Sequence, residues 1–173
     1  MVAIKTITLM LETKNIPDGG IDSGNVYLGI CGREFRIESA DEDDDDFEPG
    51  SAWTYILGDD PPTMPPGGNK IVHNTTEDDM NTPTKVYPLD TDLLVGPLAQ
   101  INFRFPVYIR LDPDPIRNDH WALARADCYV NPGTQTPDIY FGTLFREDAF
   151  LWLGTRCGKY CYLGQWVPTM PRR

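Results

Sequence analysis

INFRFPVYIRL, residues 101–111, is the stretch of sequence that decides the fold class. Its apolar side chains recur at every second position from Phe103 to Leu111. A period of two is that of a β-strand with one face in a core, because successive side chains of a strand point to opposite faces of the sheet. Pro106 lacks the backbone donor for a ladder hydrogen bond, which predicts an edge position or a bulge at that point. The segment therefore predicts a half-buried strand.

The same alternation recurs along much of the chain. It covers Thr6 to Glu12, Asn25 to Ile30, Phe35 to Ile37, Trp53 to Leu57 and Trp121 to Val130. The 16 prolines and 15 glycines are spread along the chain, and such turn-forming residues favour short strands over long helices. Many short alternating strands separated by turns predict an all-β chain, folded as an antiparallel β-sandwich or barrel.

The 173 residues are enough for one domain with a core of its own. We expect that domain at residues 1–131. Within it, residues 59–85 lose the apolar periodicity and carry clustered prolines and glycines, which predicts a long loop insertion. Residues 132–173 form a C-terminal extension with many aromatic side chains. Left exposed, that surface would exceed what a monomer normally leaves bare, so we expect the extension to pack on the sandwich or to form an interface.

The charge of the chain limits its partners. The formal net charge is -11, and such a surface repels the phosphate backbone of nucleic acids and an anionic bilayer. The first twelve residues do not have the pattern of a signal peptide, and no stretch is apolar for long enough to span a membrane. The sequence-based expectation is a soluble, cytoplasmic protein, peripheral to a membrane if it binds one, with its four cysteines as thiols.

Three motifs, in order, resemble the PLAT domain, also called the lipoxygenase homology (LH2) domain. The first is GIDSGNVYL at residues 20–28, and the second is the turn FEPGS at residues 47–51. The third is VYIR at residues 107–110, followed by WAL at 121–123 and a closing strand to Val130. The resemblance covers about residues 4–131.

The resemblance implies an eight-stranded antiparallel β-sandwich similar to C2 domains. Family members are commonly non-enzymatic modules that position a lipase, a lipoxygenase or a channel at a membrane or a partner protein, often with calcium. The chain departs from the family pattern at one ligand position, where Ser23 stands in place of an aspartate and Asp22 is displaced by one residue. No catalytic domain accompanies the module in this sequence.

Three acidic loops are the strongest candidate site, since the resemblance implies that they gather at one end of the sandwich. Calcium prefers six to eight oxygen ligands and tolerates irregular geometry, so clustered carboxylates suit it. The alternative is that the acidic run is solvated surface without a metal. The predicted calcium ligands are Asp18, Asp22, Asp43, Asp44, Asp45, Asp46, Glu48, Asp112, Asp114 and Asp119.

These observations favour a non-catalytic binding module, calcium-dependent under the first interpretation, that docks on a membrane lipid or a partner protein. Ile21 and Ile116 are the apolar loop residues that could enter a bilayer, and ordinary loop packing is the alternative for both.

Two alternatives to the binding module stay open. One is a structural or assembly subunit that forms a homo-oligomer through the aromatic extension. The other is a small hydrolase that uses His120, one of only two histidines with His73. The sequence contains no nucleophile elbow, zinc-protease motif or phosphate loop, so we do not expect an enzyme.

Overall fold

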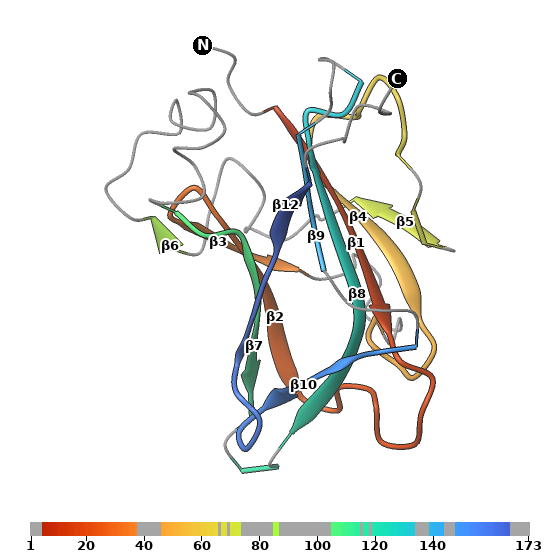
Figure 1. Cartoon of the computed structure of the whole chain (residues 1–173), viewed down its shortest axis with the longest axis vertical. Coiled ribbons are helices and arrows are strands. Elements are labelled where there is room, and N and C mark those ends of the chain that lie inside the picture. Colours follow the sequence, from red (N-terminus) through yellow and green to blue (C-terminus); the bar gives the residue numbers. More distant parts are fainter. Residues whose placement is uncertain are drawn as a thin grey trace, which may run out of the picture.

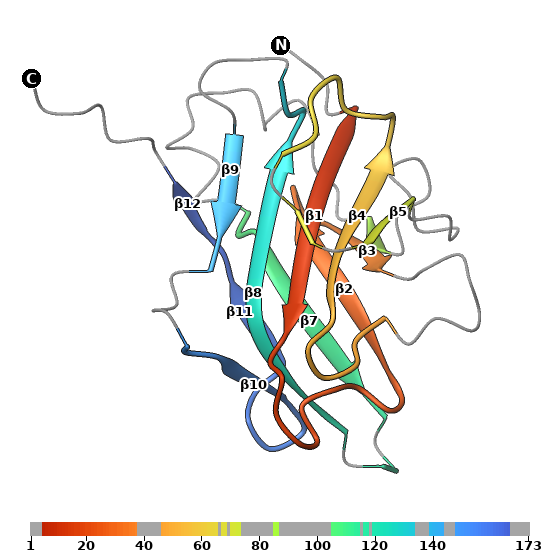
Figure 2. The same cartoon turned by 90° about the vertical axis from the view of Figure 1, so that its right-hand side faces the viewer.

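The fold is all-β. The computed structural model describes residues 5–37, 46–65, 67–68, 70–73, 85–86, 105–114, 116–117, 119–133, 139–143 and 148–166. Within these ranges, twelve strands form two sheets that face each other (Figures 1 and 2). None of the described residues belongs to a helix that could span a membrane.

The larger sheet, sheet A, contains seven strands in the order β12-β9-β8-β1-β4-β5, with β10 paired to β8 beside β9. The strands are β1 (Thr6–Thr13), β4 (Ala52–Gly58), β5 (Lys70–His73), β8 (His120–Val130), β9 (Ile139–Gly142), β10 (Leu151–Gly154) and β12 (Gly164–Trp166). β1 lies at the centre, where it pairs antiparallel with both β4 and β8. The pair β4–β5 is parallel, which is an exception to the antiparallel arrangement expected throughout.

The smaller sheet, sheet B, contains five strands in the order β11-β7-β2-β3-β6. The strands are β2 (Gly24–Ile30), β3 (Arg33–Ile37), β6 (Lys85–Val86), β7 (Tyr108–Pro113) and β11 (Tyr160–Tyr162). All of its pairs are antiparallel. β7 is flanked by β2 and β11 and begins after Pro106, so the proline marks neither an edge strand nor a bulge in it.

The core lies between the two sheets and consists of the side chains that the alternation predicts. Sheet A contributes Ile7, Leu9 and Leu11 from β1, and sheet B contributes Ile109 and Leu111 from β7; all are buried. The predicted β-sandwich is therefore confirmed. Strands β1 to β8 all lie before residue 131.

The four strands after residue 131 belong to the two sheets. β9 and β10 pair with β8, and β11 pairs with β7. Between β11 and β12 the chain passes from sheet B to sheet A, and the backbone N–H of Leu163 donates to the carbonyl of Val107 at 2.8 Å as it does so. One continuous segment thus joins the two sheets along one side of the sandwich (Figure 2). The predicted loop insertion at 59–85 contains β5 and the first residue of β6.

Candidate functional site

Three of the loops meet at one end of the sandwich, which we call the loop end. Its described residues are 14–23 between β1 and β2, 46–51 before β4, and 114, 116–117 and 119 between β7 and β8. Backbone hydrogen bonds hold the loops together: Lys14 N–H donates to the Ala122 carbonyl at 2.8 Å, and Ile21 N–H donates to the Phe47 carbonyl at 3.3 Å. The hairpin between β10 and β11, residues 155–159, also reaches this end (Figure 1).

Asp119 is a structural clamp within the loop end. Its side chain is buried, and its carboxylate accepts the backbone N–H groups of Asp22 at 3.3 Å and of Ser23 at 3.2 Å. It also accepts the N–H of His120 at 3.1 Å. A carboxylate that accepts several backbone donors is satisfied where it lies. Asp119 therefore fixes the β1–β2 loop against the start of β8.

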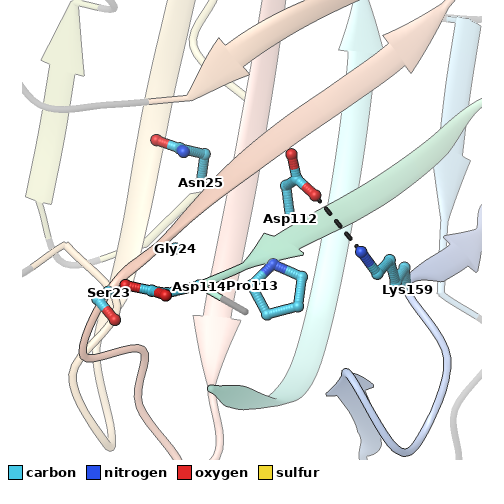
Figure 3. Close-up of a pocket in the computed structure, with 7 residues that line it drawn as sticks. All are labelled: Ser23, Gly24, Asn25, Asp112, Pro113, Asp114 and Lys159. Carbon is cyan, nitrogen blue, oxygen red and sulfur yellow. Dashed lines mark ion pairs between the residues drawn. The ribbon is translucent and has the colours of Figure 1, made fainter. Parts of the chain in front are cut away.

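Asp112 and Asp114 line a pocket of about 590 Å3 beside the loop end (Figure 3). Asp112 forms an ion pair with Lys159, with 3.5 Å between Oδ1 and Nζ, and a second with Arg110 at the same distance. Asp114 accepts the backbone N–H of Ile116 at 2.7 Å. Ser23 also lines the pocket. Two cations already neutralise Asp112, so it differs from an unpaired metal ligand.

The other predicted acidic ligands that the structure describes lie on the loop surface. Asp18, Asp22 and Glu48 are exposed, and Asp46 is half-buried. Outside the described residues lie Asp43, Asp44 and Asp45. Within the part of the chain that the structure describes, no three His, Cys, Asp or Glu side chains come close enough together to hold a metal ion. Calcium binding stays a prediction.

The two apolar candidates for membrane contact differ in exposure. Ile116, at the tip of the β7–β8 loop, is 91% exposed, and the exposed Arg117 follows it. Ile21 is partly buried and packs against the core. Of these two candidates, Ile116 is the more available for contact with a surface outside the molecule.

A second, smaller pocket of about 240 Å3 contains His120, the candidate for hydrolase chemistry. Trp152, Arg156 and the exposed Cys157 line it as well. The imidazole packs against Trp152, with 4.9 Å between the ring centroids. The pocket brings an imidazole, a guanidinium and a thiol together, an arrangement that sequence reasoning missed because the two segments are far apart along the chain.

The remaining three cysteines lie in the core. Burial raises the pKa of Cys31 to about 12, although the charge of Arg33 acts in the opposite direction, and burial raises the pKa of Cys161 to about 11. Burial also raises the pKa of Cys128, with smaller contributions from Cys31 and Asp127. A nucleophilic cysteine needs a lowered pKa and access to solvent. These three thiols are packing residues.

A buried ion pair lies on the outer face of sheet B, and no sequence pattern predicted it. Arg110 Nε donates to Glu34 Oε1 at 2.8 Å, and Arg110 Nη2 donates to Glu34 Oε2 at 3.0 Å. The Tyr108 hydroxyl also donates to Glu34, at 2.9 Å. Burial acts to lower the pKa of Arg110, but its hydrogen bond with Glu34 and the charges of Glu34 and Asp112 outweigh burial and raise that pKa. The alternation placed Tyr108 and Arg110 on this face but gave no partner for them.

Comparison with known proteins finds similarity in backbone fold only. No family model matches the chain, and no curated protein matches its sequence. Among solved structures, an alpha toxin from Clostridium absonum aligns over 94% of this chain and 32% of the toxin, with 16% identity and a TM-score of 0.49. A LOX variant aligns over 93% of this chain and 16% of its own, with 14% identity and a TM-score of 0.43. The chain thus spans about a third of the first protein and about a sixth of the second. Membership of the PLAT family stays a prediction.

Proposed function

We propose that this β-sandwich is a non-catalytic binding module that docks its loop end on a lipid surface. The observation that carries the proposal is Ile116, a large apolar side chain that is 91% exposed at the tip of a loop. Its backbone N–H donates to the Asp114 carboxylate at 2.7 Å, which orders the backbone at this residue, and its side chain is exposed to solvent. Transfer of an isoleucine side chain from water into an apolar layer is favourable by about 1.5–3 kcal/mol.

The charges at the loop end determine which lipids suit this docking. Arg117 lies next to the apolar tip, while the exposed Asp18 and Asp22 lie on the neighbouring loop. Carboxylates at an anionic membrane surface are repelled within about a Debye length, roughly 8 Å at physiological ionic strength. A zwitterionic surface lacks that repulsion. Calcium would reduce it at an anionic surface by neutralising the loop carboxylates, and this is the role that we propose for the ion.

The non-catalytic part of the proposal is supported by how the polar groups of the loop end are used. The Asp119 carboxylate accepts three backbone N–H groups, which engages most of its lone pairs in holding the loops together. Asp112 is paired with Lys159 and Arg110. Carboxylates held in this way position the loops. A general base, by contrast, needs a free lone pair within reach of the proton that it takes from the substrate.

Flotation with phosphatidylcholine vesicles tests the proposal. The Ile116→Asp variant should lower the bound fraction, with a partition coefficient at least about tenfold smaller, because each 1.4 kcal/mol corresponds to a factor of ten. Ile71→Asp is the matched control, because Ile71 is 53% exposed on β5, away from the loop end. Equal binding by the wild-type chain and Ile116→Asp would contradict the proposal, as would equal losses in both variants.

The calcium part has its own test. Vesicles that contain phosphatidylserine should bind the chain more strongly with millimolar calcium than with millimolar magnesium or a chelator. Thermal unfolding without vesicles provides a second measurement, because an ion that binds only the folded state raises the melting temperature. If calcium and magnesium act alike in both assays, calcium is not part of the function, and the acidic loops are solvated surface.

A further inference from the structure

The outer face of sheet B presents a row of tyrosines, which we call the tyrosine face. It consists of Tyr27 on β2, Tyr108 on β7, and Tyr160 and Tyr162 on β11. Tyr27 and Tyr160 flank Arg110 from opposite sides in the strand register, and Tyr162 is the register partner of Tyr108. Cys161, between the two tyrosines of β11, is buried, so the alternation of the strand places both rings on the outside. The surface is therefore built from three adjacent strands.

Two rings of the tyrosine face, those of Tyr108 and Tyr27, are held in place by contacts with the sheet and its buried ion pair. The Tyr108 ring lies directly over Gly29, where any side chain would collide with it. Its hydroxyl is fixed by Glu34, which the bidentate pair with Arg110 fixes in turn. The Arg110 guanidinium also lies 4.1 Å from the centroid of the Tyr27 ring. Rings that are ordered before binding lose less side-chain entropy when a ligand arrives.

The two tyrosines of β11 are the exposed part of the face. Tyr160 is 46% exposed and Tyr162 is 65% exposed. Their planes are within 11° of parallel, and each meets the Tyr108 ring edge-on, at centroid distances of 5.4 Å and 6.0 Å. Part of the surface of both residues stays open to solvent. Exposed aromatic rings of this kind are typical anchors for a ligand.

The polar pocket of about 590 Å3 adjoins this face along the same strands. Asn25 and Asp112 are register partners two residues along from Tyr27 and Arg110, and Lys159 directly precedes Tyr160 (Figure 3). Ser23 Oγ is buried in the pocket wall and has no hydrogen-bond partner within the described ranges. From Asp112 to Tyr108 the strand advances four residues, roughly 13 Å at about 3.3 Å per residue. The combined surface has the length of a short chain of sugar rings.

The charges on this surface balance. Among the described side chains of this surface, Arg36 (the register partner of Tyr27), Arg110 and Lys159 carry three positive charges, and Glu34, Asp112 and Asp114 carry three negative charges. The net charge of the whole chain is -11. Pairing of Arg110 and Lys159 with carboxylates leaves little attraction for a phosphate or a sulfate. A ligand for this surface needs flat C–H faces for the rings and many hydroxyl groups for a pocket of mixed donors and acceptors. We propose that the tyrosine face and the adjoining pocket bind a neutral oligosaccharide chain.

The tyrosines of this site are separate from the docking tip in the proposed function, although Asp114 both lines the adjoining pocket and accepts the backbone N–H of Ile116. Ile116 belongs to the β7–β8 loop, while the tyrosines lie on the strands of sheet B. A variant of one site can therefore be tested for the activity of the other. The two proposals fail or succeed independently.

Native affinity electrophoresis tests the proposal with defined probes. The chain is run in gels that contain hydroxyethylcellulose, xylan, galactomannan, glycogen or glycol chitin, with heparin as the acidic comparison. We expect at least one neutral polysaccharide to retard the chain, and heparin to leave its mobility unchanged. Tyr160→Ala and Tyr162→Ala should each weaken retardation at least about fivefold, since a ring contact contributes on the order of 1 kcal/mol. Both rings are exposed, so these variants should fold, which circular dichroism and the melting temperature verify.

Two controls make the outcome specific. Phe150→Ala removes an aromatic ring that is 36% exposed directly before β10, in the other sheet, and Ile116→Asp removes the docking tip. Both should retain wild-type retardation. The proposal is wrong if none of the five polysaccharides retards the chain, or if the tyrosine variants are retarded like the wild type. It is also wrong if a proline-rich peptide, a different ligand for exposed tyrosines, binds this face and no polysaccharide does.

Discussion

Replacement of Glu34 by alanine should destabilise the fold far more than its place on an outer sheet face suggests. Side-chain exposure is 2% for Glu34 and 7% for Arg110, so the substitution leaves a guanidinium charge buried without its bidentate partner. It also removes the acceptor of the Tyr108 hydroxyl. Arginine cannot lose its charge at accessible pH, so the cost cannot be relieved by deprotonation.

The expected loss is about 3 kcal/mol of unfolding free energy, the lower end of the range for breaking a buried ion pair. For a chain of this size, that corresponds to a melting temperature lower by about 6–12 °C. Urea unfolding at pH 7, followed by far-ultraviolet circular dichroism and by tryptophan fluorescence, measures it directly. The double variant E34L/R110M should regain most of the loss, because replacement of both partners by apolar groups is often neutral or stabilising.

Lys14→Ala provides the comparison, because it removes an ion pair to Asp148 whose partner side chain is 94% exposed. Such a surface pair contributes at most about 1 kcal/mol. If Glu34→Ala costs no more than Lys14→Ala, the network does not hold the tyrosine face in place. The rings of Tyr108 and Tyr27 would then not be preorganised for a ligand.

Three further predictions concern the loop end and the thiols. Asp119→Ala should cost about 1–3 kcal/mol in urea unfolding, because it leaves backbone N–H groups of the first loop without an acceptor, and a cost near zero would refute its role as a clamp. A thiol reagent at pH 8 should label Cys157 alone in the native chain and Cys31, Cys128 and Cys161 only after unfolding, as counted by mass spectrometry. Stability should fall as the pH rises above about 9, since the folded pKa values of Cys31 and Cys161, about 12 and about 11, exceed the ordinary 9.0 and the unfolded chain therefore loses its protons first. Equal urea midpoints at pH 8 and pH 10.5 would contradict that assignment.

The sandwich could be predicted because the apolar residues of its core alternate with more polar residues along each strand. Ile7, Leu9 and Leu11 recur at a period of two, and the same three side chains are buried between the sheets. The order of the strands could not be predicted in this way. The parallel pairing of β5 with β4 involves a segment, β5, that lies in a stretch without apolar periodicity, and Ile71 of β5 is exposed.

The site was predictable only as far as the grouping of its loops. The sequence does not distinguish the carboxylates of Asp112 and Asp119. In the structure, Asp112 pairs with cations, whereas Asp119 accepts backbone N–H groups. Whether a carboxylate forms an ion pair or accepts backbone N–H groups depends on neighbours that are distant along the chain. The separation is 47 residues for Lys159 and Asp112, and 97 residues for Asp22 and Asp119. Composition and spacing carry no information about such partners.

The position of β1 between β4 and β8 has a consequence for how the molecule forms. The carboxamide oxygen of Asn131 accepts the backbone N–H of Lys5, a contact between residues 126 positions apart. Closing a loop of that length costs chain entropy before any pairing compensates for it, and proteins dominated by such distant contacts fold slowly, in milliseconds to seconds. Before β8 pairs with it, β1 is hydrogen-bonded to β4 along one edge, and its other edge is unpaired. An unpaired central strand is prone to pair with another chain, so we expect refolding yields to fall as the protein concentration is raised.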